Sequence, residues 1–159
     1  MTLSFVVTSY NILPYIGRCL ASLAACARPG DRVIAVDDGS TDGTAEALET
    51  LLAESGFDPE VALHPVLLGS NTMGGVGIAA NTGLHAALSD PGCAAVFFVD
   101  GDDWLEPAGF QACRRAFETA LRAALRADGI DTVMAGWTPL GHYELQRKRA
   151  RMEIRWLLP

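Results

Sequence analysis

The segment Ala94-Ala-Val-Phe-Phe-Val99 runs directly into Asp100-Gly-Asp102-Asp103, and this change from apolar to acidic residues decides the fold. The unbroken apolar run predicts a strand that is buried on both faces, which is typical of a parallel sheet. Three carboxylates that follow such a strand are costly unless they bind something, because like charges repel and resist desolvation. Asp100 and Asp102 are two residues apart, so an extended backbone directs both carboxylates to one side. We therefore expect a ligand site at residues 100–103.

Outward from this segment, apolar strands and amphipathic helices alternate along the chain. His64-Pro65 places the third strand at an edge of the sheet, because proline cannot donate to a central ladder. The alternation predicts an α/β three-layer sandwich with a mostly parallel central sheet over residues 1–139. The expected strands are 4–8, 32–36, 61–68, 94–99 and 132–135, and the expected helices begin near Pro14, Thr44, Val76 and Pro107.

Polar residues gather after three of the expected strands, where ligands bind in open α/β sheets. The three clusters are Thr8-Ser-Tyr10-Asn11, Asp37-Asp38-Gly-Ser-Thr-Asp42 and Asp100-Gly-Asp102-Asp103. Carboxylate oxygens at the third cluster suit Mg²⁺ or Mn²⁺, which bind one or two protein carboxylates together with substrate phosphates. The second cluster also has the composition of a plain turn and helix cap, and the third that of a solvated acidic loop. Both alternatives stay open at this point.

Composition excludes several classes of protein. The 159 residues suit one domain, half of them are hydrophobic, and the net charge of −7 argues against nucleic-acid binding. The four cysteines have no metal-ligand spacing, so we expect buried, reduced thiols. No signal peptide or membrane-length apolar segment is evident, which predicts a cytoplasmic protein.

Residues 140–159 form a basic amphipathic tail. Residues 144–159 hold five of the twelve Lys and Arg residues but only two of the 19 acids. Such a segment either lies on an anionic membrane surface, at the cytoplasmic face, or packs as a helix on the acidic body.

Four motifs in order resemble the signature of family-two glycosyltransferases with the GT-A fold. The resemblance runs from about Ser4 to Pro107, roughly two thirds of the chain, and its strength lies in the order of the four motifs. They are Val6-Val-Thr-Ser-Tyr-Asn11, Val33-Ile-Ala-Val-Asp-Asp-Gly-Ser-Thr-Asp42, Ala80-Asn-Thr-Gly-Leu84 and Phe97-Phe-Val-Asp-Gly-Asp-Asp-Trp-Leu-Glu-Pro107.

The resemblance implies a nucleotide-sugar site and a metal-dependent transfer with inversion. Thr8 and Tyr10 would line the nucleobase pocket, and Asp38, with Asp37 beside it, would accept a hydrogen bond from the base. Asp100 would lie near the ribose and diphosphate, while the carboxylates of Asp102 and Asp103 would hold Mn²⁺ or Mg²⁺ as the DxD motif. The donor would be a nucleotide-diphosphate sugar, with UDP-sugar favoured, and the acceptor a hydroxyl of a glycan, a lipid-linked sugar or a small molecule.

The sequence also departs from the family pattern. Many relatives carry arginine where Ala80 stands, and neither a catalytic base nor a Gln-x-x-Arg-Trp motif is found after residue 135. The alternative function is therefore a non-catalytic or truncated nucleotide-diphosphate-binding module without its acceptor half. Trp104, directly after the acids, either walls a sugar or caps the core.

Overall fold

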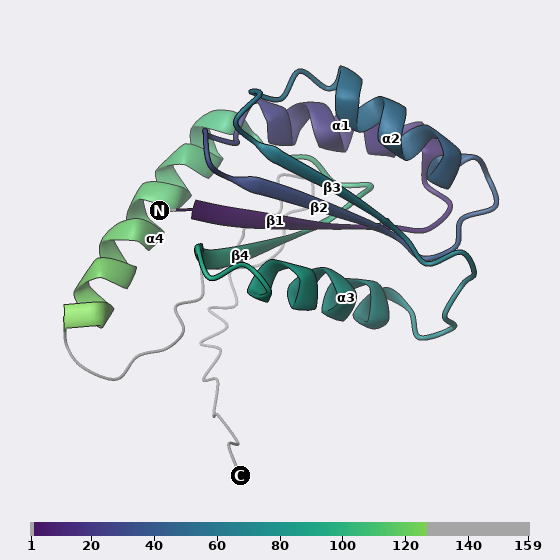
Figure 1. The fold of residues 1–159 in the computed structure, drawn as a ribbon. Helices are drawn as coiled ribbons and strands as arrows, with labels where there is room; N and C mark the ends of the chain where they lie inside the picture. The colour runs from purple at the N-terminus through teal and green to yellow at the C-terminus, as the bar shows by residue number, and fades with distance from the viewer. Residues whose placement is uncertain (1, 127–159) are drawn as a thin grey trace, which may run out of the picture.

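The computed structural model describes residues 2–126, which form a parallel sheet with helices on both faces (Figure 1). Strands and helices alternate without exception along these residues, as the sequence predicted. The elements in order are β1 (Thr2–Ser9), α1 (Leu13–Ala24), β2 (Arg32–Asp37), α2 (Thr44–Glu54), β3 (Ala62–Leu67), α3 (Val76–Leu88), β4 (Cys93–Asp100) and α4 (Pro107–Arg126).

The strand order β3-β2-β1-β4 makes β1 a central strand with parallel neighbours on both sides. The chain moves outward from β1 to β2 and β3 and then returns across the sheet to place β4 beside β1. Ser9 pairs in register with Asp37 and Thr8 with Asp100, so the carboxyl ends of three strands meet at one edge. The direction of winding changes between β1 and β4, which is where open α/β sheets bind ligands.

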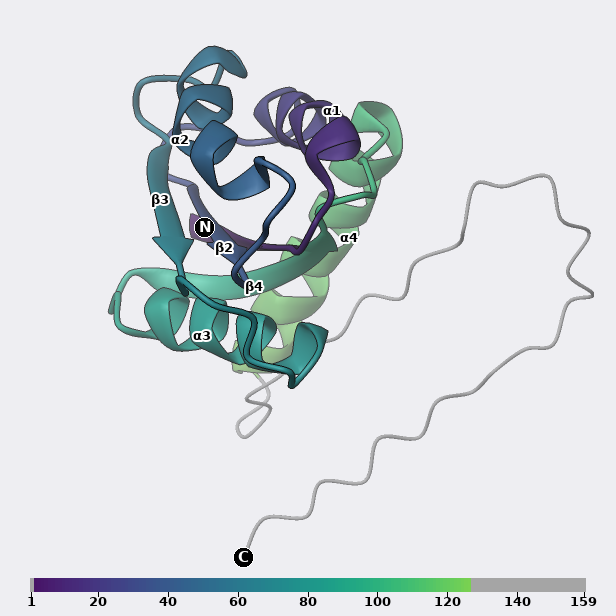
Figure 2. The same ribbon diagram turned by 90° about the vertical axis from the view of Figure 1, so that its right-hand side faces the viewer.

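Two apolar layers hold the helices to the sheet, with α1 and α2 on one face and α3 on the other (Figures 1 and 2). The larger layer joins β1 and β2 to the buried sides of α1 and α2, and Phe110 brings the start of α4 into it. Phe5, Phe97 and Phe110 pack there as a ring cluster, with centroids 5.2 to 6.2 Å apart. The smaller layer packs Val6, Ile34 and Val36 against Ala79 and Ala87 of α3.

A buried ion pair fixes α4 to the amino-terminal side of the sheet. The guanidinium of Arg114 donates to both carboxylate oxygens of Asp31 at 2.5 and 2.9 Å, and both side chains are at most 3% exposed. Asp31 also accepts the backbone N–H groups of Leu3 and Arg28. One carboxylate thus joins the start of β1, the turn before β2 and α4.

Two expectations about the strands have different outcomes. The placement of the proline-containing strand at an edge is confirmed, since among the described strands β3 pairs only with β2. The burial of β4 on both faces is wrong, because Phe98 is 50% exposed and Ala94 is exposed as well. Among the described strands β4 lies at the edge beside β1, and α3 covers the centre of that face instead.

The remaining expectations about architecture fall partly outside the described residues. The fifth strand at 132–135 and the basic tail at 140–159 both lie there. Within residues 2–126 no helix is long and apolar enough to cross a membrane. Cys19 and Cys26 are fully buried as expected, whereas Cys93 and Cys113 are partly exposed.

Candidate nucleotide-diphosphate site

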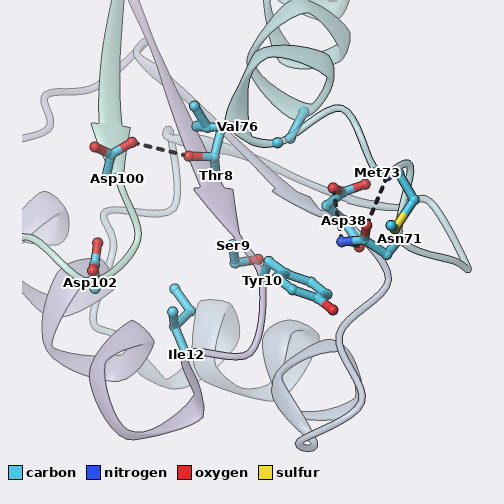
Figure 3. Close-up of a pocket in the computed structure, with 12 residues that line it drawn as sticks. Thr8, Ser9, Tyr10, Ile12, Asp38, Asn71, Met73, Val76, Asp100 and Asp102 are labelled. Atoms are coloured by element: carbon cyan, nitrogen blue, oxygen red, sulfur yellow. Dashed lines mark hydrogen bonds between the residues drawn. The ribbon is translucent and has the colours of Figure 1, made fainter.

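A cavity of about 590 Å³ opens at the carboxyl edge of the sheet, at the change of winding direction between β1 and β4. Figure 3 shows Asp100 and Asp102 on one side of it, Asp38, Asn71 and Met73 on the other, and Thr8, Ser9 and Tyr10 between them. The side chains therefore form two chemically different ends. The acidic end carries Asp100 and Asp102 with few hydrogen-bond donors, and the other, here called the amide end, carries Asp38 with amide and hydroxyl donors to its carboxylate and apolar groups beside it.

At the amide end, Asp38 is held by the loop that follows β3. Its carboxylate accepts the backbone N–H of Thr72 at 3.0 Å, the hydroxyl of Thr72 at 3.1 Å and the amide of Asn71 at 3.3 Å. Asp38 is only 3% exposed, so these donors compensate most of its desolvation. The carboxylate is therefore fixed in direction at the cavity wall before any ligand arrives.

Gly39 lets the Asp38 turn and the Asn71 loop approach this closely. Its φ of +70° lies in the left-handed region, and a Cβ there would lie 2.2 Å from the backbone carbon of Ser70. Any other residue would push the two loops apart. The glycine of the Asp-Asp-Gly motif therefore serves the geometry of Asp38.

Asp37 lies behind the cavity wall, and the cavity lining does not include it. It is fully buried, and its carboxylate accepts the hydroxyl of Ser9 at 3.1 Å and both the hydroxyl and the backbone N–H of Ser40. The two neighbouring aspartates thus differ in position. Asp38 faces the cavity, and Asp37 ties the end of β1 to the turn after β2.

Tyr10 reaches the cavity from a turn with an unusual backbone. Asn11 has a positive φ of 52°, and its side-chain oxygen accepts the backbone N–H of Thr41 at 2.8 Å. The N–H of Asn11 donates to Ser40, and that of Leu13 donates to Asp42. These bonds fasten the turn after β1 to the turn after β2, and they leave Tyr10 47% exposed beside the cavity.

At the acidic end, Asp100 ends β4 and Asp102 follows on the loop beside α1. The hydroxyl of Thr8 donates to Asp100 across 3.4 Å. Gly101 donates its N–H to the carbonyl of Thr8 at 2.8 Å, and a Cβ on Gly101 would lie 2.7 Å from that same oxygen. The middle residue of the Asp-Gly-Asp sequence is thus in close contact with the end of β1, which brings the two flanking aspartates into the cavity.

The acidic loop carries more negative charge than its own contacts balance. Burial raises the pKa of Asp103, and the charges of Asp102 and Asp100 raise it further. Beneath the loop, burial raises the pKa of Cys19 to about 12, again with a contribution from the three aspartates. A cation would relieve this crowding, since carboxylates are the ligands that Mg²⁺ and Mn²⁺ prefer.

The carboxylates suit an ion that shares its coordination with a ligand. Within residues 2–126 no group of three or more His, Cys, Asp or Glu residues is arranged to hold a metal ion alone. Asp100 and Asp102 line the cavity, and Asp103 does not. One or two carboxylates completed by phosphate oxygens is the arrangement that Mg²⁺ typically adopts with nucleotides.

The structure adds cavity residues that sequence reasoning missed. Asn71, Met73, Gly75, Val76 and Ala79 all come from the loop after β3 or the start of α3. A signal was present, because this loop follows the carboxyl end of a third parallel strand, as the two recognised clusters follow theirs. Its residues carry no acidic pair, so their types alone do not indicate a site.

Comparison with known proteins identifies relatives over most of the chain. The family model described as "Glycosyl transferase family 2" matches residues 4–157. An uncharacterized glycosyltransferase of Nostoc sp. is 30% identical over 120 residues, which are 76% of this chain and 34% of that protein. The chain thus spans about a third of the length of this curated relative.

Solved structures give the same picture. Staphylococcus aureus TarS in complex with UDP-GlcNAc aligns with a TM-score of 0.60 at 30% identity, over 76% of this chain and 32% of that one. A mannosyltransferase from Pyrobaculum calidifontis in complex with GDP-Man and Mn²⁺ aligns with a TM-score of 0.52 at 30% identity, over 64% of this chain and 28% of that one. The predicted α/β fold of GT-A type is confirmed.

Proposed function

We propose that this chain, which belongs to glycosyl transferase family 2, binds a nucleotide-diphosphate sugar in the cavity between β1 and β4 and transfers the sugar to a hydroxyl acceptor. The single observation that carries the proposal is the division of the cavity into an amide end and an acidic end. A nucleoside diphosphate has the same division, with a neutral base at one end and phosphates that need a cation at the other. UDP is the favoured nucleotide, in keeping with the UDP-GlcNAc complex of a structural relative.

At the amide end, Asp38 and Tyr10 would recognise the base. The fixed carboxylate of Asp38 would accept an N–H of the base, and the exposed ring of Tyr10 offers a face for stacking. Thr8, between the two ends, would lie along the ribose. Asp37 would act indirectly, by holding the turn that carries Asp38.

At the acidic end, Asp102 would hold Mn²⁺ or Mg²⁺ with Asp100 close to the ribose and diphosphate, and Asp103 is the further candidate ligand. A divalent ion bound there would supply Lewis-acid stabilisation of the departing diphosphate. Ala80 offers no cationic side chain to the phosphates, which increases the dependence on the ion. The expected stereochemical result is inversion.

The acceptor hydroxyl needs a general base, and the described cavity leaves that role open. Its carboxylates are Asp38, Asp100 and Asp102, and each has another proposed task at the donor. This observation favours the second candidate function, a module that binds the nucleotide diphosphate without catalysing transfer. Turnover decides between the two, because both require the same donor site.

Thermal-shift measurements with UDP, GDP, dTDP and CMP, each with and without Mn²⁺, test the donor site. We expect UDP to stabilise the protein only with Mn²⁺, since a ligand of the folded state raises its stability. Asp102→Ala should abolish the metal-dependent shift, whereas Glu49→Ala, which removes an exposed carboxylate on α2, should preserve it. Equal shifts in wild type and Asp102→Ala would remove Asp102 from the site. Binding without hydrolysis or transfer across an acceptor panel would support the non-catalytic function.

A further inference from the structure

Trp104 is a large exposed aromatic residue two positions after Asp102, on the loop that forms the acidic end of the cavity. It is 51% exposed, although the neighbouring Leu105 packs against the core. The cavity lining includes Asp102 but does not include Trp104. Two residues of chain span at most about 7 Å, so the Cα of Trp104 lies within that distance of the Cα of Asp102. The backbone of Trp104 therefore belongs to the loop that forms the acidic end, and its side chain lies outside the cavity lining.

The indole is held in place from one side. The guanidinium carbon of Arg18, on α1, lies 3.4 Å from the centroid of the Trp104 ring, which is cation–π geometry. Among the described residues Arg18 takes part in no ion pair, and its guanidinium packs on the ring of Trp104. Arg18 thus covers one face of the indole, and the exposed surface of Trp104 is on the rest of the side chain.

The backbone on either side of Trp104 is also fixed. The N–H of Asp103 donates to the carbonyl of Asp100 at 2.9 Å. The N–H of Leu105 donates at 2.9 Å to the hydroxyl of Ser22, which donates in turn to the carbonyl of Cys19 within α1. An exposed ring on a backbone that is held on both sides is preorganised, so a ligand loses little entropy by binding to it.

From these observations we infer that the open face of Trp104 is a sugar-stacking surface for the acceptor, and that Arg18 is its positioning residue. The inference rests on the proposed transfer, which requires an acceptor hydroxyl close to the donor diphosphate. The weakly positive C–H groups of a pyranose face suit the negative face of an indole, and the ring hydroxyls stay in water. A pyranose stacked on Trp104 lies next to the loop that carries Asp102 and Asp103. The ligand class is therefore a glycan or glycoside with an open pyranose face.

Fluorine NMR of 5-fluorotryptophan-labelled protein detects sugar binding at the ring of Trp104. The chain has three tryptophans, and Trp104→Phe assigns the Trp104 signal. In the presence of UDP and Mn²⁺, cellobiose and chitobiose should shift that signal. Sorbitol, which has hydroxyls but no pyranose face, should leave it unchanged. An identical shift with sorbitol, or no shift with either disaccharide, would overturn the inference.

Variants separate stacking from folding and from donor binding. Trp104→Ala should weaken disaccharide affinity, followed by saturation-transfer NMR, about tenfold, while the UDP shift with Mn²⁺ stays as in wild type. Arg18→Met keeps the apolar stem and removes the cation, so the Trp104 signal should move or broaden and disaccharide affinity should fall. Unchanged disaccharide affinity in Trp104→Ala would refute the sugar-stacking surface, and unchanged affinity in Arg18→Met would refute the role of Arg18. If the wild-type protein does not bind UDP in the presence of Mn²⁺, the proposed donor site is refuted instead.

Discussion

Gly39→Ala tests whether close contact between two loops determines the position of Asp38 at the amide end of the cavity. A Cβ at this position would lie 2.2 Å from the backbone carbon of Ser70 and 2.3 Å from the backbone nitrogen of Asn71. Both atoms belong to the backbone, so a side-chain rotation cannot relieve the clash. The loop that donates to Asp38 through Asn71 and Thr72 must therefore move away.

The expected cost has two parts, and a second glycine separates them. A left-handed φ costs an alanine roughly 1–2 kcal/mol, and overpacking adds typically about 1–3 kcal/mol. Gly30 has a φ of +86° with nothing within 4 Å of its Cβ position, so Gly30→Ala has the first part alone. Gly39→Ala should then destabilise the protein by about 2–5 kcal/mol, and Gly30→Ala by about 1–2 kcal/mol.

Urea unfolding gives these free energies, and the same samples then report on the ligand. If displacement of Asp38 weakens UDP binding tenfold, the stabilisation by saturating UDP with Mn²⁺ falls by about 1.4 kcal/mol. Gly30→Ala should keep the full stabilisation. Equal costs for the two variants would refute the clash. Wild-type UDP affinity in a folded Gly39→Ala protein would refute the role of the loop contact in base recognition.

Two further predictions concern buried groups outside the cavity. Arg114→Met should cost about 3–5 kcal/mol in urea unfolding because it leaves the carboxylate of Asp31 buried without its cation. Arg28→Met removes a 40% exposed guanidinium that lies 3.5 Å from Glu118 and donates to Gln111, so it should cost less, about 1–2 kcal/mol. Similar costs for the two variants would contradict a special role of burial. The pKa values of about 12 for Cys19 and about 11 for Cys26 keep both thiols protonated at pH 8. Ellman's reagent should therefore react with these two thiols only after the protein unfolds. Rapid modification of Cys19 in the native Cys93→Ser/Cys113→Ser protein would contradict its burial.

The sequence predicted the order of elements because each strand carries a clear apolar signal and a turn after it. Pro65 identified the edge strand, because a residue without an N–H is tolerated within an edge strand but not in a central ladder. The wrong prediction that β4 is buried on both faces comes from contacts far away along the chain. Phe98 reads as a core residue by its chemistry, but its exposure depends on which strand neighbours β4 and where α3 crosses the sheet. Neither the strand beside β4 nor the path of α3 can be predicted from the residues around Phe98.

The same distinction applies to the site. Asp100 and Asp102 were recognisable because carboxylates after a buried strand need a partner. The pair Asp37-Asp38 was recognisable only as a pair, and the structure divides it into a structural residue and a cavity residue. That division follows from strand pleating, since successive side chains point to opposite sides. Asn71 was missed because its importance comes from the carboxylate it contacts, 33 residues away along the chain.

The two ends of the cavity have different physical requirements, and the fold meets them in different ways. At the amide end, recognition of an uncharged base would need a carboxylate held in one direction. A network of backbone and side-chain donors fixes Asp38 before a ligand binds. At the acidic end, the proposed donor site would need charge that stays unbalanced until a cation and a diphosphate bind, and Asp100 and Asp102 have few donors among the described residues. If arginines balanced these carboxylates, the site would neither bind the ion nor depend on it.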